Sequence, residues 1–221
     1  MGIIIPGSPA TGMTYLELQD ETLAYGFDAS AYRSRIKSWL NEAQARICRA
    51  VTMPDLLTTY DIDTARGTAA YDLPSDLIRV SKFFHKDTLL ELAPYSSGNL
   101  RPVTQGGNST EYGTPEAYTI FTALTTQLAP IPDHVYTLTL DYYKAPPALV
   151  GDGDVSVLPA DYLDLLVSYS LQRCYRSEDD IQMAQFYMGE YQRDLEKLAV
   201  DLHGQTSPDG PKVLSGTWGE A

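Results

Sequence analysis

The sequence predicts an α+β fold: an antiparallel helical bundle built from both ends of the chain, an inserted antiparallel β-rich region, and an extended C-terminal tail. Apolar residues recur every three or four positions in residues 14–52 and 160–203, as on one face of a helix. Residues 55–150 instead carry short Thr- and Tyr-rich runs separated by turn residues, which is typical of strands. We expect a flexible segment at 1–13, one domain at 14–203 and a tail at 204–221.

The composition is that of a globular, acidic protein. The 221 residues include 16 Lys and Arg against 29 Asp and Glu, which gives a formal charge of −13. Such a balance argues against a protein that grips nucleic acid over an open surface, because phosphate binding relies on Lys and Arg. Hydrophobic residues make up 43% and charged residues 20%. The chain is long enough to bury about 70% of its extended surface.

The first two helices follow from capping and periodicity. Thr14 stands three positions before Glu17, the pattern of a capping box, and Asp28 marks the end of this helix. The next helix begins near Ser30 and stops at Pro54. Its apolar stripe, at steps of four and three, consists of Ile36, Leu40, Ala43, Ile47 and Val51.

Charge is divided unequally between these helices. Residues 14–28 hold acids and no base, whereas residues 30–51 hold five bases against the single acid Glu42. One explanation is a solvated face with ordinary helix-to-helix complementarity. The other is that these bases meet an acidic neighbour in another subunit. The candidate subunit contacts are Arg33, Arg35, Lys37, Arg46 and Arg49.

The middle of the chain predicts an antiparallel sheet, because its strands are short and no helix separates them. The strand candidates are residues 58–63, 70–73, 77–84, 118–121 and 135–143. Turn sequences rich in Gly, Pro, Asn and Asp separate them. Segment 94–116 is predicted as a long loop.

Two further helices follow. Pro159 suits the first turn of one whose apolar residues occupy two faces. Ser177 is the expected N-cap of the last helix, and Gly204 is expected to end it. The last helix carries a heptad seam of Ile181, Ala184, Met188, Tyr191, Leu195, Leu198 and Leu202. Beyond it, Val213, Leu214 and Trp218 are the larger apolar residues of a tail that is either frayed or ordered by a partner.

The sequence contains none of the motifs that mark common catalytic or nucleotide-binding sites. It lacks a phosphate loop, a nucleophile elbow, a zinc-protease helix and a dinucleotide-binding turn. Cys48 and Cys174 are expected as small core residues. The three His are isolated from ligand clusters and are expected as surface or capping residues. We therefore predict no catalytic residue, no metal and no cofactor.

Some acidic groups nevertheless allow a second interpretation. The pairs Asp161 with Asp164 and Glu178 with Asp180 resemble glycosidase carboxylates, although acids are also stabilised in the first turn of a helix. Residues 151–154 suggest a calcium loop, but they lack its later ligands, so a plain turn is favoured. No membrane-length apolar run or signal peptide is found, which predicts a soluble protein of a reducing cytoplasm.

Several segments together resemble one protein family. They are Met13–Leu18, Trp39–Ala43, Tyr71–Pro74, Gly113–Ile120 with Pro130–Asp133, and Tyr142–Pro147 leading through Asp152 to Leu158–Pro159. Over residues 13–203 the chain is similar to the head-to-tail adaptor (head-completion or connector) proteins of tailed bacteriophages.

The resemblance implies a structural role. Twelve copies would form a ring beneath the portal in the virion neck, extend the DNA channel and provide the attachment site for the tail, after assembly in the host cytoplasm. The expected partners are the portal and the tail or next neck protein, and DNA passes without specific binding because acidic walls repel phosphate. The candidate docking residues are Lys212, Val213, Leu214 and Trp218. The alternatives are another neck or tail-completion protein, a virion-associated polysaccharide hydrolase, and a binding module that dimerises through its heptad helix.

Overall fold

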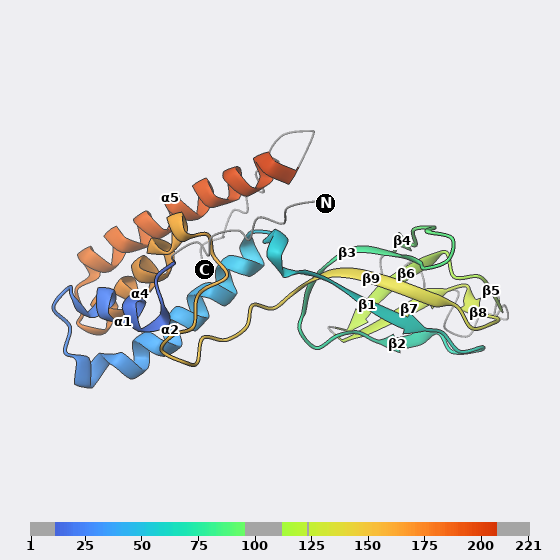
Figure 1. The fold of residues 1–221 in the computed structure, drawn as a ribbon, viewed down its shortest axis with the longest axis horizontal. Helices are drawn as coiled ribbons and strands as arrows, with labels where there is room; N and C mark the ends of the chain where they lie inside the picture. The colour runs from blue at the N-terminus through green and yellow to red at the C-terminus, as the bar shows by residue number, and fades with distance from the viewer. Residues whose placement is uncertain (1–11, 96–111, 123, 207–221) are drawn as a thin grey trace, which may run out of the picture. The chain divides into compact units, whose positions relative to one another are not determined.

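A computed structural model describes residues 12–95, 112–122 and 124–206 of the chain. The chain divides into two compact units. We call Met1–Met53 together with Pro146–Ala221 the helical unit, and Pro54–Ala145 the β unit. Figure 1 labels the helices of the first and the strands of the second. The predicted α+β class is confirmed.

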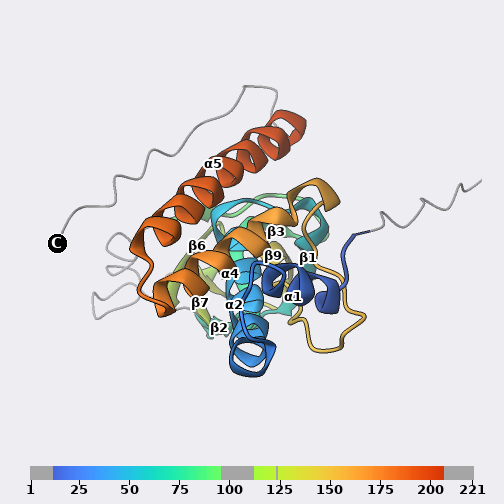
Figure 2. The same ribbon diagram turned by 90° about the vertical axis from the view of Figure 1, so that its left-hand side faces the viewer.

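The helical unit is made from both ends of the chain. Its elements are α1 (Tyr15–Leu23), α2 (Ala29–Ala50), the short 3-10 helix η2 (Ala160–Tyr162), α4 (Asp164–Ser177) and α5 (Ile181–Thr206). Helix α4 contacts α1, α2 and α5, and Figure 2 shows it between α2 and α5. Among the described residues, no helix is long and apolar enough to span a membrane.

The start of α1 confirms the predicted capping box. The Glu17 amide donates to the Thr14 hydroxyl, and the Thr14 amide donates to the Glu17 carboxylate at 2.7 Å. Asp28, in contrast, does not end α1. Helix α1 ends at Leu23, and the Asp28 carboxylate accepts the Ser30 amide at 2.8 Å as the N-cap of α2. An Asp between two predicted helices can follow the first helix or cap the second, and the sequence alone did not distinguish these two roles for Asp28.

The predicted stripe on α2 forms the core of the helical unit. Ile36, Leu40, Ala43 and Ile47 are completely buried. Helix α4 buries residues on two faces, as predicted, among them Leu165, Leu166, Val167, Leu171 and Cys174. Full burial of one such aliphatic side chain contributes about 1.5–3 kcal/mol. The unit is therefore held together by α2 and α4 in its centre.

The predicted heptad seam on α5 is only partly correct. Ala184, Tyr191 and Leu198, seven residues apart, are buried, whereas Ile181 and Met188 are exposed. One of the two heptad positions faces α4, the helix on which α5 packs, and the other position is exposed at Ile181 and Met188. The buried residues pack within the chain.

Two helix ends also differ from the prediction. Ser177 is the last residue of α4, and the Asp180 carboxylate instead accepts the Met183 amide at 3.1 Å at the start of α5. Helix α5 continues through Gly204 to Thr206. Glycine inside a helix costs about 1 kcal/mol relative to Ala, which does not by itself end a helix.

The β unit holds three small sheets. Their strand orders are β1-β9-β3, β2-β7-β6-β4 and β5-β8. The elements are the 3-10 helix η1 (Pro54–Leu56), β1 (Leu57–Asp63), β2 (Ala70–Asp72), β3 (Leu77–His85), β4 (Ala93–Pro94), β5 (Tyr112–Gly113), β6 (Ala117–Thr122), β7 (Thr125–Ala129), β8 (Ile131–Pro132) and β9 (Thr137–Lys144).

All five predicted strands are present, and most pairs are antiparallel. The prediction missed β7, which pairs with both β6 and β2. Two short pairs are parallel, β4 with β6 and β5 with β8, so the expectation of a purely antiparallel sheet is wrong. Each parallel pair includes one strand at an end of the predicted loop 94–116, β4 at its start and β5 near its end. Residues 96–111 lie outside the described part of the chain.

The two larger sheets share one apolar core. Phe83 and Leu138 come from the three-stranded sheet, and Leu128 comes from the four-stranded sheet. The rings of Phe83 and Tyr118 meet edge to face, with centroids 5.2 Å apart. This core keeps the β unit compact.

Candidate interaction surfaces

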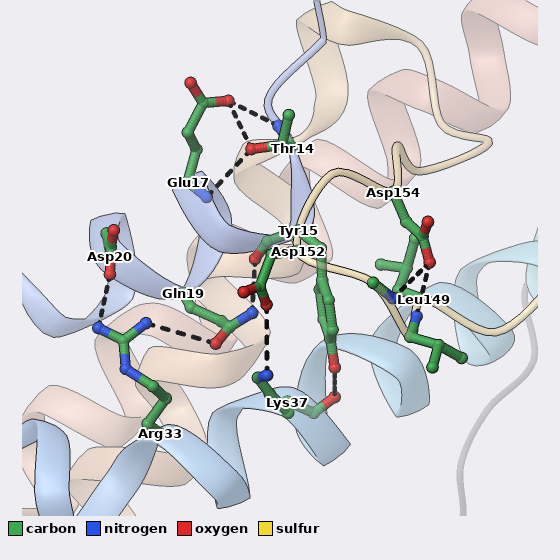
Figure 3. Close-up of polar contacts among 12 residues, drawn as sticks. Thr14, Tyr15, Glu17, Gln19, Asp20, Arg33, Lys37, Leu149, Asp152 and Asp154 are labelled. Atoms are coloured by element: carbon green, nitrogen blue, oxygen red, sulfur yellow. Dashed lines mark hydrogen bonds and ion pairs between the residues drawn. The ribbon is translucent and has the colours of Figure 1, made fainter.

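Three bases of α2 bind acids within the helical unit, and two of them, Arg33 and Lys37, bind acids that lie outside α2. The Arg33 guanidinium lies 2.7 Å from the Asp20 carboxylate of α1, and the Lys37 ammonium lies 3.4 Å from the Asp152 carboxylate (Figure 3). All four side chains are partly exposed, so each pair contributes at most about 1 kcal/mol. The first contact is of the helix-to-helix kind that the sequence allowed, and the second joins α2 to the loop before η2.

We call Arg35, Arg46 and Arg49 of α2 the basic flank. Successive helix residues are rotated by about 100°, so positions 11 and 14 apart fall within an arc of about 60°. All three are exposed. The Arg35 guanidinium lies over the Tyr32 ring at 5.9 Å, and Arg46 lies over the Tyr169 ring at 5.5 Å. Their role as subunit contacts stays a prediction.

One acid joins α2 to α4. The Glu42 carboxylate lies 2.9 Å from Arg46 and 2.8 Å from Arg173. Burial raises the pKa of Glu42, but the hydrogen bond from Tyr169 and the two guanidinium charges outweigh it, so the net pKa lies below its ordinary value of 4.5. The single acid among the bases of α2 thus has a structural task.

The loop from residue 146 to 158 is fixed to α1 and α2 by backbone groups. The Tyr15 amide donates to the Asp154 carbonyl at 2.7 Å, and the Leu16 amide donates to the Asp152 carbonyl at 3.0 Å. The Asn41 amide group donates to the Leu149 carbonyl at 2.9 Å and accepts the Leu149 amide at 2.7 Å. The loop therefore satisfies the first free N–H groups of α1.

The same geometry favours the plain turn over the calcium loop. The Asp154 carboxylate accepts the amides of Val150 and Gly151 at 2.7 and 2.8 Å, which lowers its pKa (Figure 3). Its neighbour Asp152 faces Lys37. Within the described residues, no cluster of three or more His, Cys, Asp and Glu side chains could hold a metal ion.

An aromatic cluster closes the end of the helical unit where α1 turns into α2 and α4 turns into α5. We call Tyr25, Phe27, Tyr175, Phe186 and Tyr187 the aromatic cap. Tyr175 and Tyr187 stack with centroids 5.5 Å apart, and Tyr25, Phe27 and Phe186 each meet one of them at 5.0–5.9 Å. Tyr25 is 46% exposed and Phe186 56%. Aromatic side chains at a surface are typical of protein interfaces.

A shallow hollow of about 520 Å³ lies on the outer face of α1, lined by Gly12, Met13, Glu17, Asp20 and Glu21. Glu17 is used in the capping box and Asp20 in the pair with Arg33. The hollow thus offers no free acid–base pair.

The surfaces described so far are suited to contact. A family model of the SU10 adaptor proteins matches residues 13–213, which includes nearly all of both units. The chain belongs to the SU10 adaptor protein family. A search of curated proteins found no match. The predicted resemblance to phage head-to-tail adaptors is confirmed, and the match extends ten residues beyond the predicted 203.

The two carboxylate pairs that resemble glycosidase acids occupy structural positions in this adaptor. Glu178 accepts the Tyr32 hydroxyl, and Asp180 caps α5. Asp161 lies in η2, and Asp164 is the first residue of α4, where an acid is stabilised by the helix dipole.

The cysteines of the adaptor are core residues, as predicted. Burial raises the pKa of Cys48 to about 11 and that of Cys174 to about 12. The expectation for His85 is wrong. Its ring is buried, and its Nε2 atom lies 2.6 Å from the Pro115 carbonyl oxygen, so it ties β3 to the segment before β6. His134 is exposed beside Asp133, and the side chain of His203 lies outside the described residues.

The docking residues proposed for the adaptor are Lys212, Val213, Leu214 and Trp218, and all lie outside the described part of the chain. The family match ends at 213 and so includes the first two. Sequence reasoning missed Asn41 and Gln44 as structural residues. Gln44 donates to the Pro147 carbonyl at 2.9 Å and accepts the Ser156 hydroxyl at 2.8 Å. The sequence signal that could have identified Asn41 and Gln44 is their position beside the apolar stripe of α2.

Proposed function

We propose that this protein is a structural component of a phage neck: it forms a ring beneath the portal, extends the DNA channel and provides the attachment site for the tail. The observation that carries the proposal is the family match over residues 13–213. In this role both units act as one adaptor domain, with the helices of the two chain ends as an antiparallel bundle. The ring copies the portal symmetry and contains twelve subunits.

The charge of the chain supports passage of DNA without binding. The formal charge is −13, and several bases of α2 are engaged by acids of the same chain. A ring with this balance repels the phosphate backbone, so duplex DNA slides through the channel. No catalytic step or cofactor belongs to this function.

The C-terminal residues provide the portal contact in this proposal. Val213, Leu214 and Trp218 are apolar groups in a segment of Gly, Pro, Ser and Thr, and a few apolar anchors commonly carry most of a binding energy. Lys212 adds a charge beside them. Anchors of this kind order a segment only when the partner is present.

A truncation that leaves α5 intact tests the proposed function. Because α5 extends to Thr206, the chain should be shortened to residues 1–206, which leaves the helix intact. We expect the shortened chain to keep its circular dichroism spectrum and to lose co-sedimentation with the portal protein of the same phage. Unchanged co-sedimentation would refute the anchoring role. A full-length chain with Trp218→Ala is the graded control, with weaker binding expected.

Electron microscopy of the complex with the portal tests the ring. We expect class averages with the rotational order of the portal. Sedimentation of the protein alone is expected to give a monomer or a weak oligomer. A complex with a tail component and none with the portal would instead support another neck or tail-completion protein.

A further inference from the structure

We propose that the aromatic cap of one copy receives Arg46 and Arg49 of the next copy, so that neighbouring subunits join head to tail around the ring. The proposal rests on the proposed function, which requires many identical copies, and it names the surfaces through which they meet. It also names the acidic neighbour that the bases of α2 were expected to find.

The aromatic cap presents ring surface to solvent at one end of the helical unit. Tyr25 and Phe186 are about half exposed, and both touch Tyr187. The turns on which the cap is built lie together at the left of Figure 1. The two exposed rings lie at the edge of the cluster, because each contacts Tyr187, which stacks on Tyr175. Phe27 and Tyr175 meet each other at 5.0 Å and do not depend on them.

Acidic residues occupy the two turns that carry the cap and the positions beside them. Glu21 lies in the last turn of α1, and Tyr25 follows it by four residues in the turn that leads to α2. The turn between α4 and α5 adds a run of three acids against one base, Arg176. The acidic residues in and beside the two turns are Glu21, Asp28, Glu178, Asp179 and Asp180, of which Asp28 caps α2, Asp180 caps α5 and Glu178 accepts the Tyr32 hydroxyl.

Aromatic faces beside carboxylates select cationic side chains. A guanidinium over an aromatic ring gains attraction from the ring quadrupole, and the acids add charge attraction. The chain already uses this chemistry internally, with Lys37 over Tyr15, Arg35 over Tyr32 and Arg46 with Arg173 over Tyr169. The chemistry of the cap therefore fits an arginine-bearing helix.

A second copy offers such a helix at a suitable place. Arg46 and Arg49 lie in the last turns of α2, whereas the cap lies beside its first residues. With about 1.5 Å of rise per residue, these sites are about 25–30 Å apart along α2. One subunit can thus receive a neighbour at the cap and offer its arginines to another. A contact between two different surfaces is heterologous, and it closes into a ring when the rotation allows.

Cross-linking of engineered cysteines tests the pairing. The variant carries Tyr25→Cys and Arg49→Cys, and the probe is a short bismaleimide added to the protein bound to its portal. The native thiols are buried with raised pKa values, so the wild type serves as an unreactive background. We expect a ladder of covalent oligomers from the double variant and none from either single variant. The matched control, Tyr25→Cys with Lys197→Cys on α5, should give none.

A charge exchange provides a second readout that does not depend on new thiols. Glu21→Lys and Arg49→Glu should each reduce the fraction of closed rings in micrographs at least tenfold, and the combined variant should restore it. Loss in both singles without restoration would contradict a direct contact between the two surfaces.

The outcomes separate this inference from the proposed function. Rings on the portal without a ladder, or dimers from a single-cysteine variant, would overturn the head-to-tail pairing and leave the adaptor function standing. If no variant or wild type binds the portal, the proposed function fails. The same cross-linking on the concentrated free chain then decides the pairing, because a ladder supports it and its absence overturns it.

Discussion

Replacement of Asn41 by Ala should loosen the loop of residues 146–158 from α2. The Asn41 side chain accepts the Leu149 amide at 2.7 Å and donates to the Leu149 carbonyl at 2.9 Å, with further contacts to the Lys37 carbonyl and the Tyr15 hydroxyl at 3.1 Å. Leu149 is only 4% exposed, so water cannot easily replace the lost amide. Asn41→Ala therefore leaves a buried backbone donor and acceptor without their partner.

The cost follows from those two groups. An unsatisfied buried polar group costs about 1–3 kcal/mol. The sum for two is reduced by the higher helix propensity of Ala, which recovers up to about 0.7 kcal/mol. We expect the free energy of unfolding of the helical unit to fall by about 1–5 kcal/mol, which corresponds to about 2–20 °C in Tm at this chain length.

Urea unfolding followed at the helix band of the circular dichroism spectrum measures this change. Ser38→Ala, an exposed position on the same helix, is the matched control and should change stability by less than about 0.5 kcal/mol. Hydrogen exchange should also become faster at Leu149. Equal midpoints for Asn41→Ala and Ser38→Ala, with unchanged exchange at Leu149, would refute the reasoning.

Three further predictions concern other parts of the molecule. Phe83→Ala should remove about 3–5 kcal/mol from the β unit, because Phe83 is 1% exposed; hydrogen exchange should quicken in β3 and β9 and not in α4. Cys48 and Cys174 should not react with a thiol reagent at pH 8 until denaturant is added, because burial raises their pKa values to about 11 and about 12. Backbone hydrogen bonds lower the pKa of Glu17 and of Asp154 in the folded state, so the unfolded chain binds more protons in acid. The contribution of these two carboxylates to the free energy of unfolding should be complete above about pH 5 and should be lost as the pH falls through their lowered pKa values. In urea unfolding measured from pH 7 to pH 3, Glu17→Gln should therefore lose less stability than the wild type.

The helices and long strands could be predicted because the spacing of apolar residues along the chain follows the face of each element that is buried. The stripe of Ile36, Leu40 and Ile47 is buried in full, and the strand predicted at 135–143 became β9, the central strand of its sheet. The capping box at Thr14 was equally local, since both of its hydrogen bonds join residues three apart. Features that depend on neighbours in sequence could thus be predicted from the chain alone.

Features that depend on distant neighbours could not. The sequence Thr125–Ala129 lacks the strong alternation of a strand, and β7 forms because β6 and β2 flank it on either side. Asn41 holds a residue 108 positions away, and no local pattern reveals such a partner. The aromatic cap brings Phe27 and Tyr175 together across most of the chain. On α5, the regular seam misled because only one neighbouring helix covers it.

The division of the helical unit between the two chain ends has a consequence for biosynthesis. A ribosome releases α1 and α2 first, and the β unit follows before α4 leaves the exit tunnel. The buried stripe of α2 then waits for more than a hundred residues before its principal partner arrives. Exposed apolar surface promotes aggregation, so the interval between the synthesis of α2 and that of α4 is the stage at which the nascent chain is most vulnerable.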